Sequence, residues 1–415
     1  MENVRIESIE ITNIGVFEHL KLDFPKKINS EQAEVHILTG ENGTGKSTIL
    51  MLLTGLADNA NEQECKKRAW GSSSYSINYQ EYQEKCTFKF RLKDASTDVP
   101  LQSEQATKDT VDYAFFAYSN DRQLKAFESL ETENSIARHP FVEAVKFDKT
   151  IDAANFLSWI STTKTRALIA QANGDKQEYV SYTKAISEIE KALSEITGKS
   201  IEFSLASKPY LRVVLKMDGQ SLDIDVLPDG IKSTIRWLGD LLMRLENIPW
   251  TEATLISLHQ NFVLFLDEIE VHLHPMWQRS ILPVIQKLFK NAQIFISTHS
   301  PFVVGSVDGA WIHKLKKEGQ FAILDGEPMP SEDGKSTRLI LDEIFGVNQQ
   351  YGIQVEEDLK KFRVLRDKVM AREENYPNQT LEQLANALAN QGAELYQIIA
   401  REQYQLERIM SKTIS

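Results

Sequence analysis

Residues 40–48 read Gly-Glu-Asn-Gly-Thr-Gly-Lys-Ser-Thr and match the nucleotide-binding pattern G-x-x-x-x-G-K-[ST] at every specified position. The sequence predicts a short apolar strand before them, over 35–39, and an apolar helix after them, from Ser47 to Leu56. Because glycines let the backbone curl, successive N–H groups can point at phosphate oxygens, and the helix N-terminus adds its positive dipole. This order of strand, loop and helix favours a phosphate-binding loop over a chance glycine-rich turn.

The loop predicts a set of nucleotide and metal ligands. We expect Lys46 to reach the β- and γ-phosphates of a nucleotide, and the Ser47 hydroxyl to bind Mg²⁺, which prefers oxygen ligands beside phosphates. The residues expected to contact the nucleotide are Gly40, Asn42, Gly43, Thr44, Gly45, Lys46, Ser47 and Thr48.

Two further apolar segments end in residues suited to phosphate chemistry. The run 262–266 is apolar throughout, as in a central parallel strand, and Asp267 and Glu268 follow at its carboxyl end, where ligands collect in open α/β sheets. We expect Asp267 to hold Mg²⁺, directly or through water, and Glu268 to polarise the attacking water; an acidic strand cap is the alternative. The run 294–296 leads to His299, which could donate to the γ-phosphate or serve a structural role.

These segments, in this order, resemble the ATP-binding-cassette (ABC) type of AAA-family ATPase, in particular the branch of chromosome-maintenance, Rad50, RecF and OLD-like proteins. Residues 9–17 resemble the strand pair with which that branch opens. Residues 270–275 resemble the segment that follows its acidic motif. The resemblance implies an α/β ATPase head with a mixed, mainly parallel nucleotide-binding sheet. It also implies ATP and Mg²⁺ as cofactors, and Glu268 and His299 as catalytic residues.

The branch also carries a signature motif, which contacts the γ-phosphate bound by a partner subunit. Residues 227–234, Leu-Pro-Asp-Gly-Ile-Lys-Ser-Thr, resemble it, and the resemblance assigns Asp229, Gly230 and Lys232 to that contact. Pro228 stands where a serine is common, so slow hydrolysis is one expected consequence. For the glutamine-bearing loop of the family, the candidates Gln80, Gln83 and Gln123 stay open.

The chain is expected to divide into four parts. These are an N-terminal ATPase lobe with the phosphate loop (1–150), a helical hairpin insertion (151–200), an ATPase lobe with the signature, acidic and histidine motifs (201–350) and a C-terminal helical region (351–415). The two helices of this hairpin, each of about 20 residues, would be about 30 Å long. This is far shorter than the coiled coil of a chromosome-condensing protein. We prefer a packing lobe to a moving arm for the hairpin.

Composition limits the classes of partner. The 415 residues carry 47 basic and 59 acidic side chains, a net charge of −12, which is the wrong sign for a dedicated nucleic-acid coat. Any DNA contact must therefore be local. The side chains that could bind DNA phosphates, or could simply be solvated surface charges, are Lys164, Arg166, Lys176, Lys314, Lys316 and Lys317. Two cysteines argue against a disulfide framework or a zinc site, and no signal peptide or membrane span is predicted, so we expect a cytoplasmic protein.

About 70 residues follow Phe345, without the acidic cluster or the length of a nuclease domain. Among cassette-type ATPases, the stand-alone ATPase subunits of phage-defence systems are therefore the best resemblance, with the Septu system first and the PARIS system second. This implies a dimer or higher oligomer that hydrolyses ATP and regulates a separately encoded nuclease, such as the HNH protein of Septu. The alternatives are a RecF-like DNA-repair clamp and an ATP-sensing scaffold with little turnover.

Overall fold

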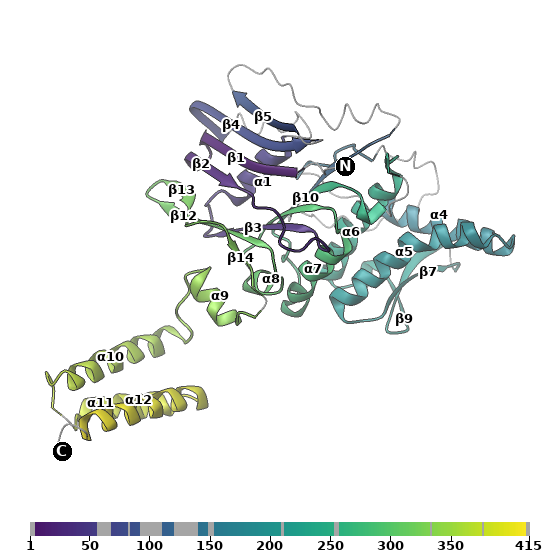
Figure 1. Ribbon diagram of the computed structural model, residues 1–415. Coiled ribbons are helices and arrows are strands. Elements are labelled where there is room, and N and C mark those ends of the chain that lie inside the picture. The colour runs from purple at the N-terminus through teal and green to yellow at the C-terminus, as the bar shows by residue number, and fades with distance from the viewer. Residues whose placement is uncertain are drawn as a thin grey trace. The chain divides into compact units, whose positions relative to one another are not determined.

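The computed structural model describes residues 5–55, 68–81, 84–91, 110–119, 140–147, 153–208, 211–252, 257–332, 334–375 and 377–411. The chain forms two compact units, one ending at Phe345 and the other beginning at Gly346 (Figure 1). Within the described ranges, no helix is both long enough and apolar enough to cross a membrane.

A mixed, mainly parallel sheet forms the centre of the first unit, as the sequence predicted. Its main strand order is β13-β12-β3-β11-β10-β6, and β14 pairs with the side of β12. The five strands from β12 to β6 run parallel, while β13 and β14 run antiparallel to β12. The strands are β3 (Glu34–Gly40), β6 (Ala114–Tyr118), β10 (Phe262–Asp267), β11 (Gln293–Ser297), β12 (Trp311–Glu318), β13 (Phe321–Leu324) and β14 (Met329–Pro330).

One face of this sheet is covered by the helix after the phosphate loop and by an antiparallel sheet of order β2-β1-β4-β5. Ile49 and Leu53 of the helix pack in one cluster with Phe265 and Phe295 of the central strands. The apolar runs of β10 and β11 are therefore buried on both faces, as parallel strands usually are. The elements are α1 (Lys46–Thr54), β1 (Arg5–Ile14), β2 (Phe17–Asp23), β4 (Ala69–Glu81) and β5 (Glu84–Arg91).

Helices and a small sheet, β7-β8-β9, cover the opposite face. Leu238 of α6 and Leu282 of α7 share a cluster there with Leu264 of β10. The elements of unit 1 on and beside this face are α6 (Asp229–Asn247), α7 (Pro275–Leu288), α8 (Pro301–Val304), α9 (Thr337–Glu343), β7 (Ile201–Ala206), β8 (Arg212–Met217), β9 (Gln220–Asp223), η2 (Ile224–Val226) and η3 (Ser257–His259).

The residues of the expected insertion form two helices, α4 (Ala153–Ala172) and α5 (Lys176–Thr197). Gly174 has a φ of 77° in the turn between them, and the Asp175 carboxylate caps α5 by accepting from the N–H groups of residues 177 and 178. Ile189 and Leu193 of α5 are buried in the same cluster as α6 and α7. The buried residues of α5 thus pack inside unit 1, as expected of a packing lobe.

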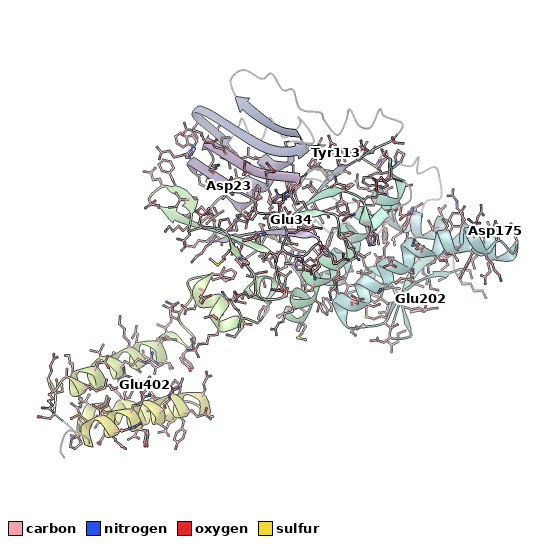
Figure 2. All side chains as sticks on the ribbon, viewed as in Figure 1. Asp23, Glu34, Tyr113, Asp175, Glu202 and Glu402 are labelled. Atoms are coloured by element: carbon pink, nitrogen blue, oxygen red, sulfur yellow. The ribbon has the colours of Figure 1, made fainter. Side chains whose placement is uncertain are left out.

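The second unit has its own core, built by α10 (Ile353–Met370), α11 (Gln379–Ala389) and α12 (Ala393–Ser411). Phe362, Leu388 and Ile399, one from each helix, are buried together. The carboxylate of Glu402 on α12, labelled in Figure 2, accepts a hydrogen bond of 3.2 Å from Arg363 Nε of α10. The apolar side chains of α10, α11 and α12 therefore pack against one another.

A buried polar network lies where β1 meets the central sheet. The Glu34 carboxylate, labelled in Figure 2, accepts side-chain hydrogen bonds from Arg5 Nε (2.9 Å), His36 Nε2 (2.9 Å) and Gln293 Nε2 (2.7 Å). Burial alone would raise the pKa of Glu34, but the hydrogen bonds of His36 and Arg5 outweigh that effect and lower the pKa to about 2. Ionised Glu34 therefore links the antiparallel sheet that contains β1 to the central sheet.

We expect this network to make the protein acid-sensitive. The folded pKa of Glu34 lies below its reference value of 4.5, so its stabilising effect is complete above pH 4.5 and is lost as the pH falls toward 2. The loss amounts to about 3 kcal/mol of unfolding free energy. Chemical denaturation across this pH range should show a shallower dependence in Glu34→Gln, whereas the exposed control Glu31→Gln should follow the wild type. An unchanged slope in Glu34→Gln would contradict this prediction.

Candidate nucleotide-binding site

The phosphate loop occupies the five residues between the end of β3 at Gly40 and the start of α1 at Lys46. Gly40, Gly43 and Gly45 have φ angles of 144°, 77° and 86°, which favour glycine. A β-carbon on Gly40 would lie 2.2 Å from the Leu315 carbonyl oxygen of β12, and one on Gly45 would lie 2.3 Å from Phe17 Cζ of β2. The loop is thus held tightly between β12 and β2, in the curled form that a phosphate needs.

Lys46 lies inside the curl of the loop. Its Nζ donates to the carbonyl oxygens of Gly40 and Glu41, each at 3.0 Å, and the residue is only 6% exposed. Burial lowers the pKa of Lys46, while the negative charges of Asp267 and Glu268 act in the opposite direction. The ammonium group therefore stands at the centre of the loop, where it can exchange carbonyl oxygens for phosphate oxygens.

The remaining loop residues shape the cradle or lie at its edge. The Thr44 hydroxyl donates to the Glu41 carbonyl oxygen at 2.9 Å, and Asn42 is exposed. The Thr48 hydroxyl accepts a hydrogen bond from Arg68 Nη1 at 2.9 Å. Sequence reasoning missed Arg68 because no motif marks it; only the fold brings it to α1.

The expected metal ligands meet in the structure. Ser47 Oγ donates to Asp267 Oδ1 over 3.0 Å, although the two residues are 220 positions apart in the chain. Asp267 pairs in register with Ser297 of β11, whose hydroxyl also donates to the Asp267 carboxylate. Hydroxyl and carboxylate oxygens beside a phosphate loop are the donors that Mg²⁺ prefers. The residues present therefore fit a magnesium ion bound together with a nucleotide.

Glu268 follows directly, at a sharp turn of the backbone. Its φ is 51°, in the left-handed region that favours glycine, and its N–H points at the Ser297 carbonyl (3.1 Å) and hydroxyl (3.0 Å) oxygens. These two contacts hold the strained residue in place. The turn ends β10 and fixes Glu268 beside Asp267.

His299 is tied to the acidic segment through its backbone. Its N–H donates to Glu270 Oε1 at 2.6 Å. Burial and the charge of Lys46 lower the pKa of His299, against the attraction of Glu268, so the imidazole is neutral at pH 7. Burial raises the pKa of Glu270, which the hydrogen bond from His299 opposes. Glu270 lay inside the run quoted for the family resemblance, but sequence reasoning gave it no role.

The signature residues lie at the start of α6. Asp229 and Lys232 form an ion pair one turn apart, with 3.7 Å between Nζ and Oδ1. In the described part of the chain, no hydrogen bond or ion pair joins residues 229–232 to loop 40–48. The glutamine candidates Gln83 and Gln123 lie outside the described residues, and so does the side chain of Gln80.

Gly230 is needed for packing. A β-carbon there would lie 2.5 Å from the His272 carbonyl oxygen and 3.1 Å from the Trp277 ring. Glycine to alanine usually stabilises a helix, but we expect Gly230→Ala to destabilise unit 1 by about 1–3 kcal/mol because the backbone oxygen cannot move away cheaply. Thermal denaturation should show a lower Tm than for the open control Gly334→Ala. Equal Tm values for the two variants would contradict this packing argument.

The chain is similar to several known proteins over most of its length. The chain is 24% identical to the Retron Vc95 probable ATPase of Vibrio cholerae serotype O1 biovar El Tor, over 80% of this chain and 79% of that protein. It is 21% identical to the Septu protein PtuA of Bacillus thuringiensis, over 72% of each chain. The sequence resemblance named Septu but not retrons. Among solved structures, the SMC head domain from Thermotoga maritima shares 13% identity with a TM-score of 0.43, covering 79% of this chain and 99% of that one.

A protein-family model also matches residues 35–305, from the strand before the phosphate loop to the segment after His299. This range covers about two thirds of the 415 residues and contains the loop, the acidic strand and the histidine. The chain therefore belongs to the family described as AAA domain, putative AbiEii toxin, Type IV TA system.

Proposed function

We propose that this protein binds ATP with Mg²⁺ at loop 40–48 and hydrolyses it. The observation that carries the proposal is the contact between Ser47 Oγ and Asp267 Oδ1, because it joins the phosphate loop to the acidic strand at one candidate metal position. A loop alone would indicate only phosphate binding. A loop joined to carboxylates supports phosphoryl transfer to water.

Each residue has a distinct part in this chemistry. Lys46 binds the phosphates, and Ser47 and Asp267 would hold Mg²⁺, which neutralises phosphate charge when bound. Glu268 accepts a hydrogen bond from the attacking water and orients it. Neutral His299 donates to the γ-phosphate, and Glu270 positions His299 through its backbone N–H.

Phosphate release from ATP by the purified protein tests this proposal. We expect release that requires Mg²⁺, is stopped by EDTA and is lost in Asp267→Asn. The control Asp308→Asn changes an exposed aspartate in the turn before β12 and should keep the wild-type rate. ATP binding without release would favour the ATP-sensing scaffold. Wild-type release in Asp267→Asn would remove the metal role from this residue.

We further propose that two copies complete each other's sites. Within the described residues, the signature residues 229–232 make no hydrogen bond or ion pair with the loop of their own chain. The first turn of α6 carries two charged side chains, Asp229, which is exposed, and Lys232, which is half-buried. The first turn of a helix offers unpaired N–H groups to an anion. A second copy could thus present α6 to the γ-phosphate held by loop 40–48 of the first.

The cellular role that we propose is phage defence through a separately encoded nuclease. The support is the similarity to Septu proteins and retron ATPases. Cells that express this protein with the nuclease gene beside it should restrict phage plating, and Lys46→Ala should restore plating. Replication genes beside it, and no effect on phage, would instead favour a repair clamp.

A further inference from the structure

Strand β12 continues past the end of its neighbour β3. The register pairs Leu315 with Gly40, the last residue of β3, so Lys316, Lys317 and Glu318 extend beside the phosphate loop. Pairing with β13 supports this extension, with Lys317 opposite Ala322. The hairpin therefore forms a fixed wall along one side of the nucleotide loop.

The pleat of β12 sends its lysines to opposite faces. Lys314 and Lys316 share one face, and both pair with Asp325, at 3.2 Å and 2.8 Å. Lys317 falls on the other face with Leu315, which packs in the cluster that contains α1. Two of these three lysines are therefore held by a carboxylate, and the third is directed to the side of the loop and α1.

Lys317 reaches the loop itself. Its Nζ lies 3.2 Å, and its Cε 3.6 Å, from the position that a β-carbon on Gly43 would take. Lys317 forms no ion pair with any residue in the described ranges. Its ammonium group thus stands against the apex of the loop with no carboxylate from the described residues to neutralise it.

We propose that Lys317 is a second phosphate-binding cation of the site, one that approaches the nucleoside triphosphate from β12 while Lys46 approaches it from α1. This inference rests on the proposed ATP binding. A triphosphate carries several negative charges within a few ångströms, so a second ammonium group beside the loop lowers the free energy of the bound state. Because Lys317 is exposed, its effect is smaller than that of Lys46 and weakens with salt.

Calorimetric titration with ATP and Mg²⁺ at low salt tests the inference. We expect the Kd to rise about threefold to tenfold in Lys317→Gln and further in Lys317→Glu, as for the loss or reversal of one partly exposed charge. The neighbouring control Lys316→Gln removes the same charge from the opposite face and should stay within about twofold of the wild type. The difference between the two glutamine variants should shrink at high salt.

Three results would overturn the inference. Wild-type affinity in Lys317→Glu, alongside lost binding in Lys46→Ala, would reject Lys317 while leaving the ATP site standing. An equal loss in Lys316→Gln would show an effect of net charge rather than of position. Absence of ATP binding by the wild type would reject both the site and this residue. Matching thermal denaturation of the variants would show that a changed Kd does not come from misfolding.

Discussion

Lys46→Ala is expected to abolish measurable ATP binding. Lys46 is the cation at the centre of the loop. Its ammonium group donates to the carbonyl oxygens of Gly40 and Glu41, which a phosphate would replace. Removing the buried, charge-assisted partner that Lys46 provides costs about 3 kcal/mol, which corresponds to about a hundredfold weaker binding. Calorimetry with ATP and Mg²⁺ measures this loss directly.

The control for this variant is Lys290→Ala. Lys290 is an exposed lysine that pairs with Glu31, so its removal takes away one charge without touching the loop. The control should bind ATP as the wild type does. A Kd for Lys46→Ala equal to that of the control would show that nucleotide binds elsewhere.

Glu268→Gln should leave ATP binding intact and lower turnover by about a hundredfold or more, as for the loss of a general base. The amide keeps the shape of the side chain but no longer attracts the proton of the attacking water. The N–H contacts of Glu268 with Ser297 come from the backbone and remain in the variant. The variant should therefore retain ATP that the wild type would convert to ADP.

Phosphate release and the nucleotide that stays bound after gel filtration measure this effect together. The control is Glu202→Gln, which changes an exposed glutamate that pairs with Lys216. This variant should hydrolyse ATP at the wild-type rate. If Glu268→Gln releases phosphate as fast as that control, another group orients the water.

Local sequence patterns were sufficient to predict much of the fold. The apolar runs 262–266 and 294–296 became β10 and β11, and Gly40 to Ser47 became a strand end, loop and helix start. Each of these segments is defined by neighbours in sequence, by buried strands or by glycine conformations. The meeting of Ser47 with Asp267 followed from the rule that the carboxyl ends of parallel strands share one edge.

Other features depend on register and could not be predicted. Whether Lys316 or Lys317 faces the loop depends on which residue of β12 pairs with Gly40, and a shift by one position would exchange them. The network around Glu34 joins three strands that are far apart in sequence, β1, β3 and β11. The contact of Gly230 with the His272 carbonyl likewise arises only when α6 packs on the segment after β10.

The central claim is that ATP is hydrolysed at sites that two copies build together, and mixing two inactive variants tests it most directly. Lys46→Ala removes the loop cation, and Lys232→Glu places a negative charge on the signature helix. A mixed dimer then holds one doubly damaged site and one intact site, so the mixture should recover part of the phosphate release that neither variant shows alone. Verified mixed dimers that remain as inactive as the separate variants would contradict composite sites that fire independently, and would leave either obligate coupling of both sites or no shared site.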